Sequence, residues 1–322
     1  MALDLMQPNS EPKHRNYIIP IVAVLVLVSM SMCGLFLFRG LGDYNELTQM
    51  QLTWTEIQKI ADTPPEDPQD IITEVIDEEG NVLEIVAGDP DDLYRPINLT
   101  GLYEVNPDLS GYIYIPGTEV NYPILKETVP GDYYYLDHNI YNKTDKYGSI
   151  FEISDEERGI PGIDNAVNVI FGHHMASGAM FSGIYGFYNE ETREEYRDKP
   201  IYIYRRDVRT EYRVSAVCIV KNNDIVYDFD AYARGSENYE ILLEHIKEKQ
   251  VDGITFNQPL PTKDEDMVVL STCYGGAGTS WRLIVVCTEY RKVTVPNTYN
   301  SYGDASIVTE DIALNATPEE ER

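Results

Sequence analysis

Cys273 lies at the boundary between an apolar run and a loop. It follows the run VVLST, precedes the glycine-rich stretch YGGAGTSW, and is separated by that stretch from Arg282, which opens the next apolar run. Thiolate is the reactive form of cysteine, and free cysteine has a pKa of about 8.5, so a nearby cation is needed at neutral pH. If the loop returns as a hairpin, Arg282 lies beside Cys273. Its guanidinium can then hold a peptide carbonyl or a developing oxyanion.

The remaining cysteines have settings that do not suggest catalysis. Cys33 falls within an apolar run near the N-terminus, and Cys218 and Cys287 fall in the middle of apolar runs. We interpret Cys218 and Cys287 as small core residues. A bridge between them needs neighbouring strands, which the sequence alone does not establish. Four cysteines in 322 residues do not form a disulfide framework.

A nucleophile of this kind also needs a proton carrier. His173 and His174 end the run NAVNVIFG, which places them at a second predicted boundary between strand and loop. One of them can act as the acid that protonates a leaving amine; the alternative is a pair of surface loop histidines. We interpret His138 as a surface or supporting residue and expect His245 to face outward on a charged helix.

Zinc is a possible alternative role for His173, His174 and Cys273. Adjacent histidines point to opposite sides of a strand, and the sequence contains neither H-E-x-x-H nor C-x-x-C. We therefore expect no metal and no other cofactor.

The charge of the chain limits its partners. With 54 acidic and 25 basic residues, the formal net charge is −29. Nucleic-acid binding requires clustered lysine and arginine, so this composition argues against it. The excess of carboxylates instead indicates a solvated, self-repelling surface.

Residues 17–38 form an apolar stretch, YIIPIVAVLVLVSMSMCGLFLF, of 22 residues without a charge. That length matches a helix crossing a hydrocarbon core of about 30 Å. Lys13, His14 and Arg15 precede it, which predicts a cytoplasmic segment 1–16 and an extracellular remainder. The stretch is longer than the core of a signal peptide and has no A-x-A site after it, so we expect an uncleaved anchor.

Between this stretch and the folded domain, residues 39–98 are expected to form a juxtamembrane helix and an acidic spacer. Residues 42–61 carry apolar side chains at helical spacing. Residues 62–94 hold twelve acidic residues and no lysine or arginine, which is typical of an extended, solvated linker. The piece EVIDEEGNVLEIV could form a small hairpin around Gly80.

Residues 99–295 are expected to form the folded domain. Short runs rich in β-branched and aromatic residues, such as KPIYIYRR and YRVSAVCIV, alternate with Gly, Pro, Asn and Asp. Seven or eight strands at this spacing predict a mainly β fold, a closed barrel or a sandwich. Helices are expected at 188–198 and at 238–249, the second with one apolar face. Residues 296–322 are polar and predict a disordered tail.

Taken together, the motifs resemble those of sortases, the membrane-anchored cysteine transpeptidases of Gram-positive surfaces. That family has a leucine, any residue, a threonine and the catalytic cysteine, with an upstream histidine and an arginine on the following strand. Here Leu270-Ser271-Thr272-Cys273, Gly172-His173 and Arg282 match it in order. Class B sortases are most similar, through YYYLDHN, GSIF, GHHMASGAMF and a helix before the catalytic strand. The resemblance extends over residues 103–289.

The resemblance implies an eight-stranded sortase barrel and a division of roles. Cys273 would be the nucleophile, His173, which directly follows glycine, the acid/base, and Arg282 the group that positions the substrate carbonyl. Ser271 and Thr272 would line the site. The implied reaction cleaves a sorting motif in a secreted protein and joins it to a peptidoglycan amine. Arg282 falls nine positions after Cys273, whereas class B enzymes often have the arginine eight positions after the cysteine.

Two other functions are compatible with the sequence. A pilus-assembling sortase would use a pilin lysine as acceptor, and the Asp-Pro pairs at 67–68 and 89–90 could belong to a lid over its site. A catalytically inactive surface-binding barrel is the alternative from another class. With the pKa values of the free amino acids, on the order of 1% of a thiol–imidazole pair is doubly charged at pH 7. The enzyme reading therefore predicts slow turnover.

Overall fold

The computed structural model of the 322-residue chain contains two compact units, residues 1–53 and residues 54–322. The predicted N-terminal segment 1–16 and the polar tail 296–322 lie outside the residues that the structure describes. The described backbone covers residues 18–66, 72–85, 90–127, 133–154, 165–228, 231–276 and 278–295.

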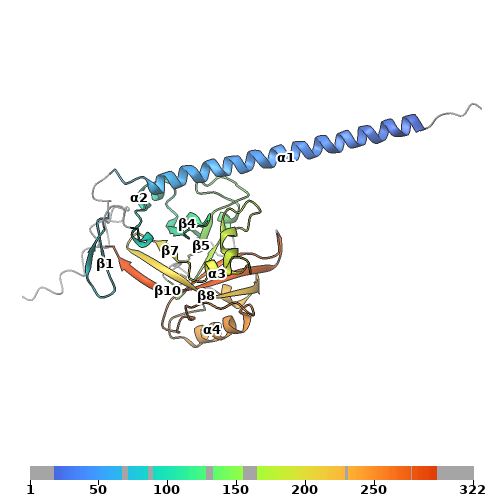
Figure 1. The fold of residues 1–322 in the computed structure, drawn as a ribbon. Helices are drawn as coiled ribbons and strands as arrows, with labels where there is room; N and C mark the ends of the chain where they lie inside the picture. Colours follow the sequence, from blue (N-terminus) through green and yellow to red (C-terminus); the bar gives the residue numbers. More distant parts are fainter. Residues whose placement is uncertain are drawn as a thin grey trace, which may run out of the picture. The chain divides into compact units, whose positions relative to one another are not determined.

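Eight strands of the second unit form a closed barrel in the order β10-β8-β7-β3-β4-β5-β6-β9, and β9 pairs back onto β10 (Figure 1). Two of the pairings, β4 with β5 and β6 with β9, are parallel, and the others are antiparallel. The predicted closed eight-stranded barrel is therefore confirmed. The strands are β3 (Leu109–Tyr114), β4 (Asn121–Glu127), β5 (Ile150–Ile153), β6 (Val167–Phe171), β7 (Ile201–Tyr204), β8 (Val208–Lys221), β9 (Met267–Cys273) and β10 (Trp281–Thr294).

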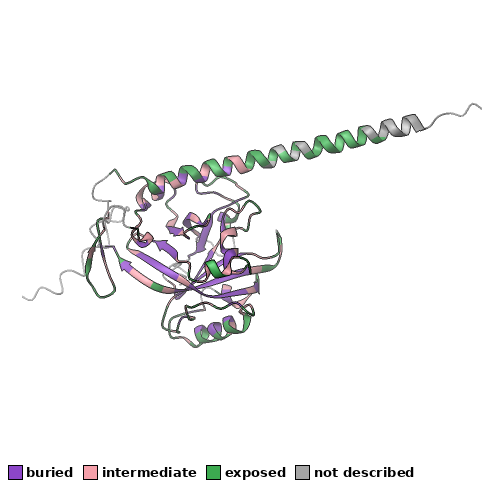
Figure 2. Ribbon diagram, viewed as in Figure 1, coloured by how far each residue is buried: buried purple, intermediate pink, exposed green. Residues whose placement is uncertain are grey.

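The barrel strands are buried on both faces over much of their length, as the burial colours in Figure 2 show. In β9, six residues before Cys273 are buried and Cys273 itself is intermediate. Such continuous apolar runs arise where one face of a sheet packs into a barrel interior and the other is covered by a helix. The strand therefore emerges from the core at the cysteine.

The acidic segment differs from the expected solvated spacer. The weakly indicated hairpin is present as β1 (Glu74–Ile76) and β2 (Val82–Glu84), joined through a turn in which Gly80 has φ +85°. Ile76 pairs with Thr294 at the end of β10, and Val75 is fully buried. Val75 packs inward while the adjacent Glu74 is exposed, so part of the segment adds to the barrel sheet despite its overall charge.

Helix α1 (Ile18–Asp62) includes the predicted juxtamembrane helix and all but the first residue of the predicted span 17–38. Within the residues that the structure describes, no helix contains a stretch long and apolar enough to cross a membrane.

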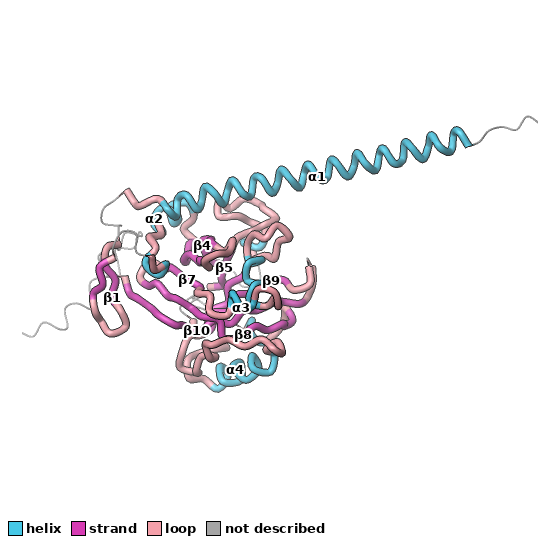
Figure 3. Tube along the Cα trace, in the orientation of Figure 1, coloured by secondary structure: helices cyan, strands magenta, loops and turns pink. Residues whose placement is uncertain are grey.

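The other helical segments lie between the strands and are shown in cyan in Figure 3. The helix expected at 188–198 is shorter, spanning only Arg193–Tyr196, and follows a 3-10 segment. The helix expected at 238–249 is present. These elements are η2 (Asp92–Tyr94), α2 (Leu99–Val105), η3 (Tyr134–Leu136), η6 (Phe181–Phe187), α3 (Arg193–Tyr196), η7 (Ile225–Tyr227) and α4 (Glu237–Lys249).

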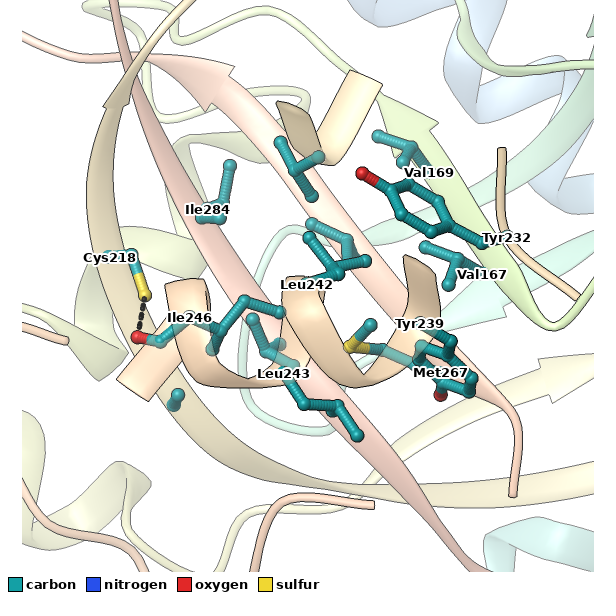
Figure 4. Close-up of a cluster of buried hydrophobic side chains, with 14 of the residues drawn as sticks. Val167, Val169, Cys218, Tyr232, Tyr239, Leu242, Leu243, Ile246, Met267 and Ile284 are labelled. Atoms are coloured by element: carbon teal, nitrogen blue, oxygen red, sulfur yellow. Dashed lines mark hydrogen bonds between the residues drawn. The ribbon is translucent and has the colours of Figure 1, made fainter. Parts of the chain in front are cut away.

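Helix α4 covers one outer face of the barrel. Its N-terminus is capped by Ser236, whose side chain accepts a hydrogen bond from the backbone N–H of Tyr239 at 3.2 Å. Its apolar face, Tyr239, Leu242, Leu243 and Ile246, packs on β6, β8, β9 and β10 (Figure 4). The thiol of Cys218 lies in this cluster and donates to the carbonyl of Ile246 at 3.6 Å. The helix thus buries the face of β9 that ends at Cys273.

Truncating Leu242 to alanine should lower the free energy of unfolding by about 2–5 kcal/mol, because the side chain is fully buried and leaves a cavity. Chemical denaturation measures the effect. The neighbouring Ile241 is 54% exposed, so Ile241→Ala is the matched control and should change stability by about 0.5 kcal/mol or less. Equal losses in both variants would contradict the packing described for α4.

Candidate active site

Cys273 and Arg282 are direct partners across the antiparallel β9–β10 ladder. The next pair along, Tyr274 and Trp281, is hydrogen-bonded, with the N–H of Tyr274 donating to the carbonyl of Trp281 at 3.0 Å. Cys273 and Arg282 therefore form a non-hydrogen-bonded pair, in which the Cα atoms lie about 4.5 Å apart and the side chains share one face. The predicted hairpin return is confirmed, and it places Cys273 and Arg282 opposite each other on adjacent strands.

The connecting loop needs its glycines. Gly275, Gly276 and Gly278 have φ values of +83°, +111° and +74°, in the region that side-chain-bearing residues rarely adopt. Arg282 Nη1 also donates to the carbonyl of Thr279 at 2.7 Å. The loop therefore turns sharply and fixes one end of the guanidinium.

The parallel pairing of β6 with β9 places the histidines at the same rim as the cysteine. Phe171 is level with Ser271, and the ladder continues as the N–H of Gly172 donates to the carbonyl of Ser271 at 3.1 Å. The hydroxyl of Thr272 then donates to the carbonyl of Gly172 at 2.7 Å. Strands β6 and β9, from distant parts of the chain, are thus joined at Gly172 and Thr272. These residues directly precede His173 and Cys273.

Gly172 leaves no room for a side chain. A Cβ atom there would lie 2.5 Å from Ile150 Cδ1 and 2.7 Å from the ring of Phe181. The glycine before His173 is therefore required by packing, because η6 and β5 close on the backbone at that point.

The two histidines have different environments. His173 is half-buried, and its Nε2 lies 2.7 Å from the carbonyl oxygen of Leu136. His174 is more exposed and stacks on Tyr185 with ring centroids 4.0 Å apart. Burial lowers the pKa of His174 below its ordinary value, opposed by a hydrogen bond with the backbone of Cys273. The His174 ring thus bonds to the backbone of the cysteine strand, whereas the His173 ring contacts the backbone of Leu136.

Tyr185, which the sequence analysis did not single out, holds the backbone at the cysteine. Its hydroxyl donates to the carbonyl of Cys273 at 2.7 Å and also bonds the backbone of Gly275. Burial raises the pKa of Tyr185 to about 12, so the phenol remains a donor at neutral pH. Nothing in the run GAMFSGIYGFY distinguishes this tyrosine from its neighbours, because its role depends on a contact 88 residues away.

A second tyrosine, Tyr227, contacts the strand two residues before Cys273. The hydroxyls of Tyr227 and Ser271 are 2.9 Å apart. Burial raises the pKa of Tyr227 to about 12, against the opposing effects of the bond to Ser271 and the nearby charge of Arg282. Of the predicted lining residues, Ser271 thus shares the face of Cys273, whereas Thr272 points to the opposite face and fastens the strands.

The other cysteines are separated from this site. Cys218 and Cys287 are buried free thiols, and their strand partners, Ile284 and Val268, place them on opposite faces of the sheet. Burial raises the pKa of both thiols, that of Cys218 to about 12. They are core residues as predicted, and unreactive because the thiolate is disfavoured.

The remaining histidines have partners of their own. His138 bonds the carboxylate of Asp137 at 2.7 Å and stacks on Tyr134. His245, expected to face outward, is largely buried and bonds both carboxylate oxygens of Asp224 at 2.9 and 3.0 Å. The difference arises because the segment after β8 folds over that side of α4.

No group of three or more His, Cys, Asp or Glu residues in the described part of the chain could hold a metal ion. In chemical terms, a thiol can act as a nucleophile, an imidazole can carry a proton and a guanidinium can hold a fixed positive charge. Such groups suit acyl transfer at a peptide bond.

The protein is thus a closed β-barrel with a cysteine at the end of one of its strands. The family model described as "Sortase domain" matches residues 113–290, more than half of the chain. The chain therefore belongs to the sortase family, whose members are cysteine transpeptidases.

Two relatives are named as Sortase B. A protein named Sortase B from Listeria monocytogenes is 27% identical over 54% of this chain and 66% of its own length, so slightly less than two thirds of that protein is matched. Sortase B from Staphylococcus aureus is 27% identical over 60% of this chain and 74% of its own length. The chain is thus distantly similar to class B sortases.

Solved structures agree on the fold. Sortase B from Bacillus anthracis has a TM-score of 0.54 at 21% identity, over 77% of this chain and 99% of that one. A structure described as a Staphylococcus aureus sortase B–substrate complex has a TM-score of 0.51 at 22% identity, over 60% and 85% of the two chains. At this level of identity, the likeness shows the shared barrel.

Alkylation should distinguish the thiols. We expect iodoacetamide to modify Cys273 in the folded protein and to leave Cys218 and Cys287 unmodified until the chain is unfolded, because burial suppresses their thiolates. Mass spectrometry of peptides gives the extent of modification at each site. The same cysteines in the chemically unfolded chain serve as the reference for accessible thiols. Cys273 reacting no faster than Cys218 would contradict the site.

Proposed function

We propose that this chain is a membrane-anchored, class B-like sortase that cleaves a sorting motif in secreted proteins and joins them to a peptidoglycan amine. The observation that carries the proposal is the direct pairing of Cys273 with Arg282, at the same rim of the barrel as the Gly172-His173 backbone.

In the first half-reaction, the Cys273 thiolate attacks the carbonyl carbon of a peptide bond in the sorting motif. The carbon–nitrogen bond breaks, His173 gives a proton to the departing amine, and a thioester remains on the cysteine. In the second, an acceptor amine attacks the thioester, its proton passes to His173, and the thiolate leaves. The enzyme is restored, and one amide has been exchanged for another.

Arg282 is assigned to the carbonyl oxygen. In the tetrahedral intermediate, that oxygen carries negative charge, and a guanidinium fixed on the same face as the sulfur stabilises it. Nη1 of Arg282 donates to the carbonyls of Thr279 and Trp281, and these bonds orient the guanidinium before substrate binds. Arginine suits this role because it stays protonated.

His173, rather than His174, is assigned as the group that gives a proton to the departing amine. The pKa of His174 is lowered, so its ring is mostly neutral at pH 7 and has little proton to give. Its ring is also committed to Tyr185 and to the Cys273 backbone. His173 directly follows the glycine that fastens the two strands, which keeps its distance from the cysteine fixed.

Substrate and location rest on other features. The Staphylococcus aureus structure named above contains a substrate, which supports a peptide sorting motif as the ligand here. The uncharged stretch 17–38 supports a single anchor with the catalytic domain outside the cell. With a net charge of −29, nucleic acid is not a partner that this surface favours.

The pilus-assembling alternative depended on a lid formed by the acidic segment. Asp67, Pro68 and Asp89 lie outside the described residues. The described hairpin β1–β2 pairs with Thr294, at the opposite end of β10 from Arg282. That part of the segment therefore lies away from the cysteine, and we favour cell-wall anchoring.

Single substitutions in the full chain test the roles, with cleavage of fluorogenic sorting-motif peptides and amide formation with an added amine as the measurements. Cys273→Ala should abolish both. Arg282→Ala and His173→Ala should each lower kcat/KM on the order of a hundredfold or more, because each removes transition-state stabilisation or proton transfer.

His174→Ala is the matched control for His173 and should retain most of the activity. A larger loss in His174→Ala than in His173→Ala would reverse the assignment. If the wild-type chain cleaved no motif, with or without an amine, the inactive surface-binding barrel would be favoured.

The pH dependence of kcat/KM should be bell-shaped. Activity needs a deprotonated Cys273 and a protonated His173, so it rises as the thiol loses its proton and falls as the imidazolium loses its own. Initial rates between pH 5 and 10 measure the two limbs. A flat profile over that range would contradict the assigned proton transfer.

A further inference from the structure

Two motifs have no chemical role in the mechanism above: the Tyr-rich stretch that contains η3, and the Gly148-Ser149 pair before β5. Both lie close to the ring of His173. Nε2 of that ring lies 2.7 Å from the carbonyl oxygen of Leu136. This contact indicates which ring nitrogen of His173 carries a hydrogen, because a carbonyl oxygen can only accept a hydrogen bond.

A hydrogen must therefore reside on Nε2 whenever the contact is made. In the neutral ring this leaves Nδ1 with the free lone pair, and in the charged ring it leaves the Nδ1 proton as the one that can be given away.

The position of the Leu136 carbonyl is fixed on one side by the preceding residue, Tyr135. Tyr135, which is 2% exposed, donates from its hydroxyl to the carboxylate of Asp108 at 2.6 Å and accepts from the amide of Asn106 at 3.0 Å. The adjacent Tyr133 has φ +51°, which turns the chain into η3. One side of the carbonyl is thus tied to the core through its neighbour.

Gly148 and Ser149 fix the other side. The N–H of Ser149 donates to the carbonyl of Tyr135 at 2.8 Å, and its hydroxyl donates to the carbonyl of His138 at 3.0 Å. Gly148 has φ +56°, and a Cβ there would lie 2.6 Å from the Tyr135 oxygen and even closer to that of Leu136. Only glycine lets β5 and η3 approach this closely.

We propose that the Leu136 carbonyl, held between the buried Tyr135 and the side-chain-free Gly148, is a positioning acceptor that keeps His173 protonated on Nε2 and assigns Nδ1 to proton exchange. The inference deepens the proposed function and rests on its assignment of His173. It gives the Tyr-rich stretch and the Gly148-Ser149 pair one shared purpose, the orientation of an imidazole on another strand.

The first test reads the tautomer directly. Nitrogen-15 NMR of the full chain, labelled at the histidine rings, distinguishes a protonated from an unprotonated ring nitrogen, and His173→Gln identifies the resonances of His173. We expect the neutral ring to carry its hydrogen on Nε2. A neutral ring protonated on Nδ1 would overturn the inference, whatever the activity of the protein.

The second test displaces the carbonyl. Gly148→Ala should lower kcat on the order of a hundredfold, the scale expected for a misplaced catalytic group, with little change in KM. It should also produce a mixture of the two tautomers. Gly80→Ala is the matched control: Gly80 has φ +85° but no atom within 4 Å of its Cβ position, so that variant carries similar backbone strain without the contact. Equal kcat values for the two variants would also overturn the inference.

The two proposals fail separately. If Gly148→Ala does not fold, Tyr135→Phe loosens the same carbonyl by removing one buried hydroxyl, and it should shift the tautomer ratio and lower kcat in the same direction. An Nε2-protonated ring in a wild-type chain that cleaves no peptide would uphold the positioning contact and reject the sortase activity. The reverse pattern, an active chain protonated on Nδ1, would reject the positioning contact alone.

Discussion

The site depends on strand β9 having one parallel and one antiparallel neighbour. The antiparallel partner, β10, supplies a residue directly opposite Cys273, and the parallel partner, β6, ends at Phe171, level with Ser271. Antiparallel neighbours can be joined by a short loop, so Arg282 follows the cysteine closely in sequence. Parallel neighbours need a long crossover, and so the histidine lies about a hundred residues upstream. The sequence separations of the three groups follow from this one arrangement.

Closure of the barrel makes the arrangement rigid. Because β9 pairs on both edges, it has no free edge along which to slip, and a one-residue shift would turn Cys273 to the opposite face. The apolar cluster under α4 adds a second restraint, since Met267 and Val269 share the face of the cysteine and are buried beneath the helix. The side chains therefore meet through packing of residues that have no chemical role.

Features that arise from short stretches of sequence could be predicted, whereas features that arise from contacts between distant segments could not. The barrel, helix α4 and the Cys273–Arg282 pairing were predictable, because strand periodicity, an amphipathic repeat and a short glycine loop are local patterns. The roles of Tyr185, Tyr227 and the Leu136 carbonyl were not, because each depends on contact between segments far apart in the chain. The acidic hairpin was only weakly indicated, since its few apolar residues are outnumbered by carboxylates.

The stretch Leu270-Ser271-Thr272-Cys273 shows why a motif can be strict in some positions and free in others. Side chains alternate along a strand, so Ser271 and Cys273 share one face while Leu270 and Thr272 share the other. Leu270 is fully buried in the barrel, and the Thr272 hydroxyl, 2% exposed, satisfies the carbonyl of Gly172. Replacing Thr272 with valine would leave that carbonyl without this donor, at a cost of about 1–3 kcal/mol, and would loosen the histidine strand from the cysteine strand. Threonine is thus required by the backbone carbonyl of Gly172, whereas the Ser271 hydroxyl bonds that of Tyr227.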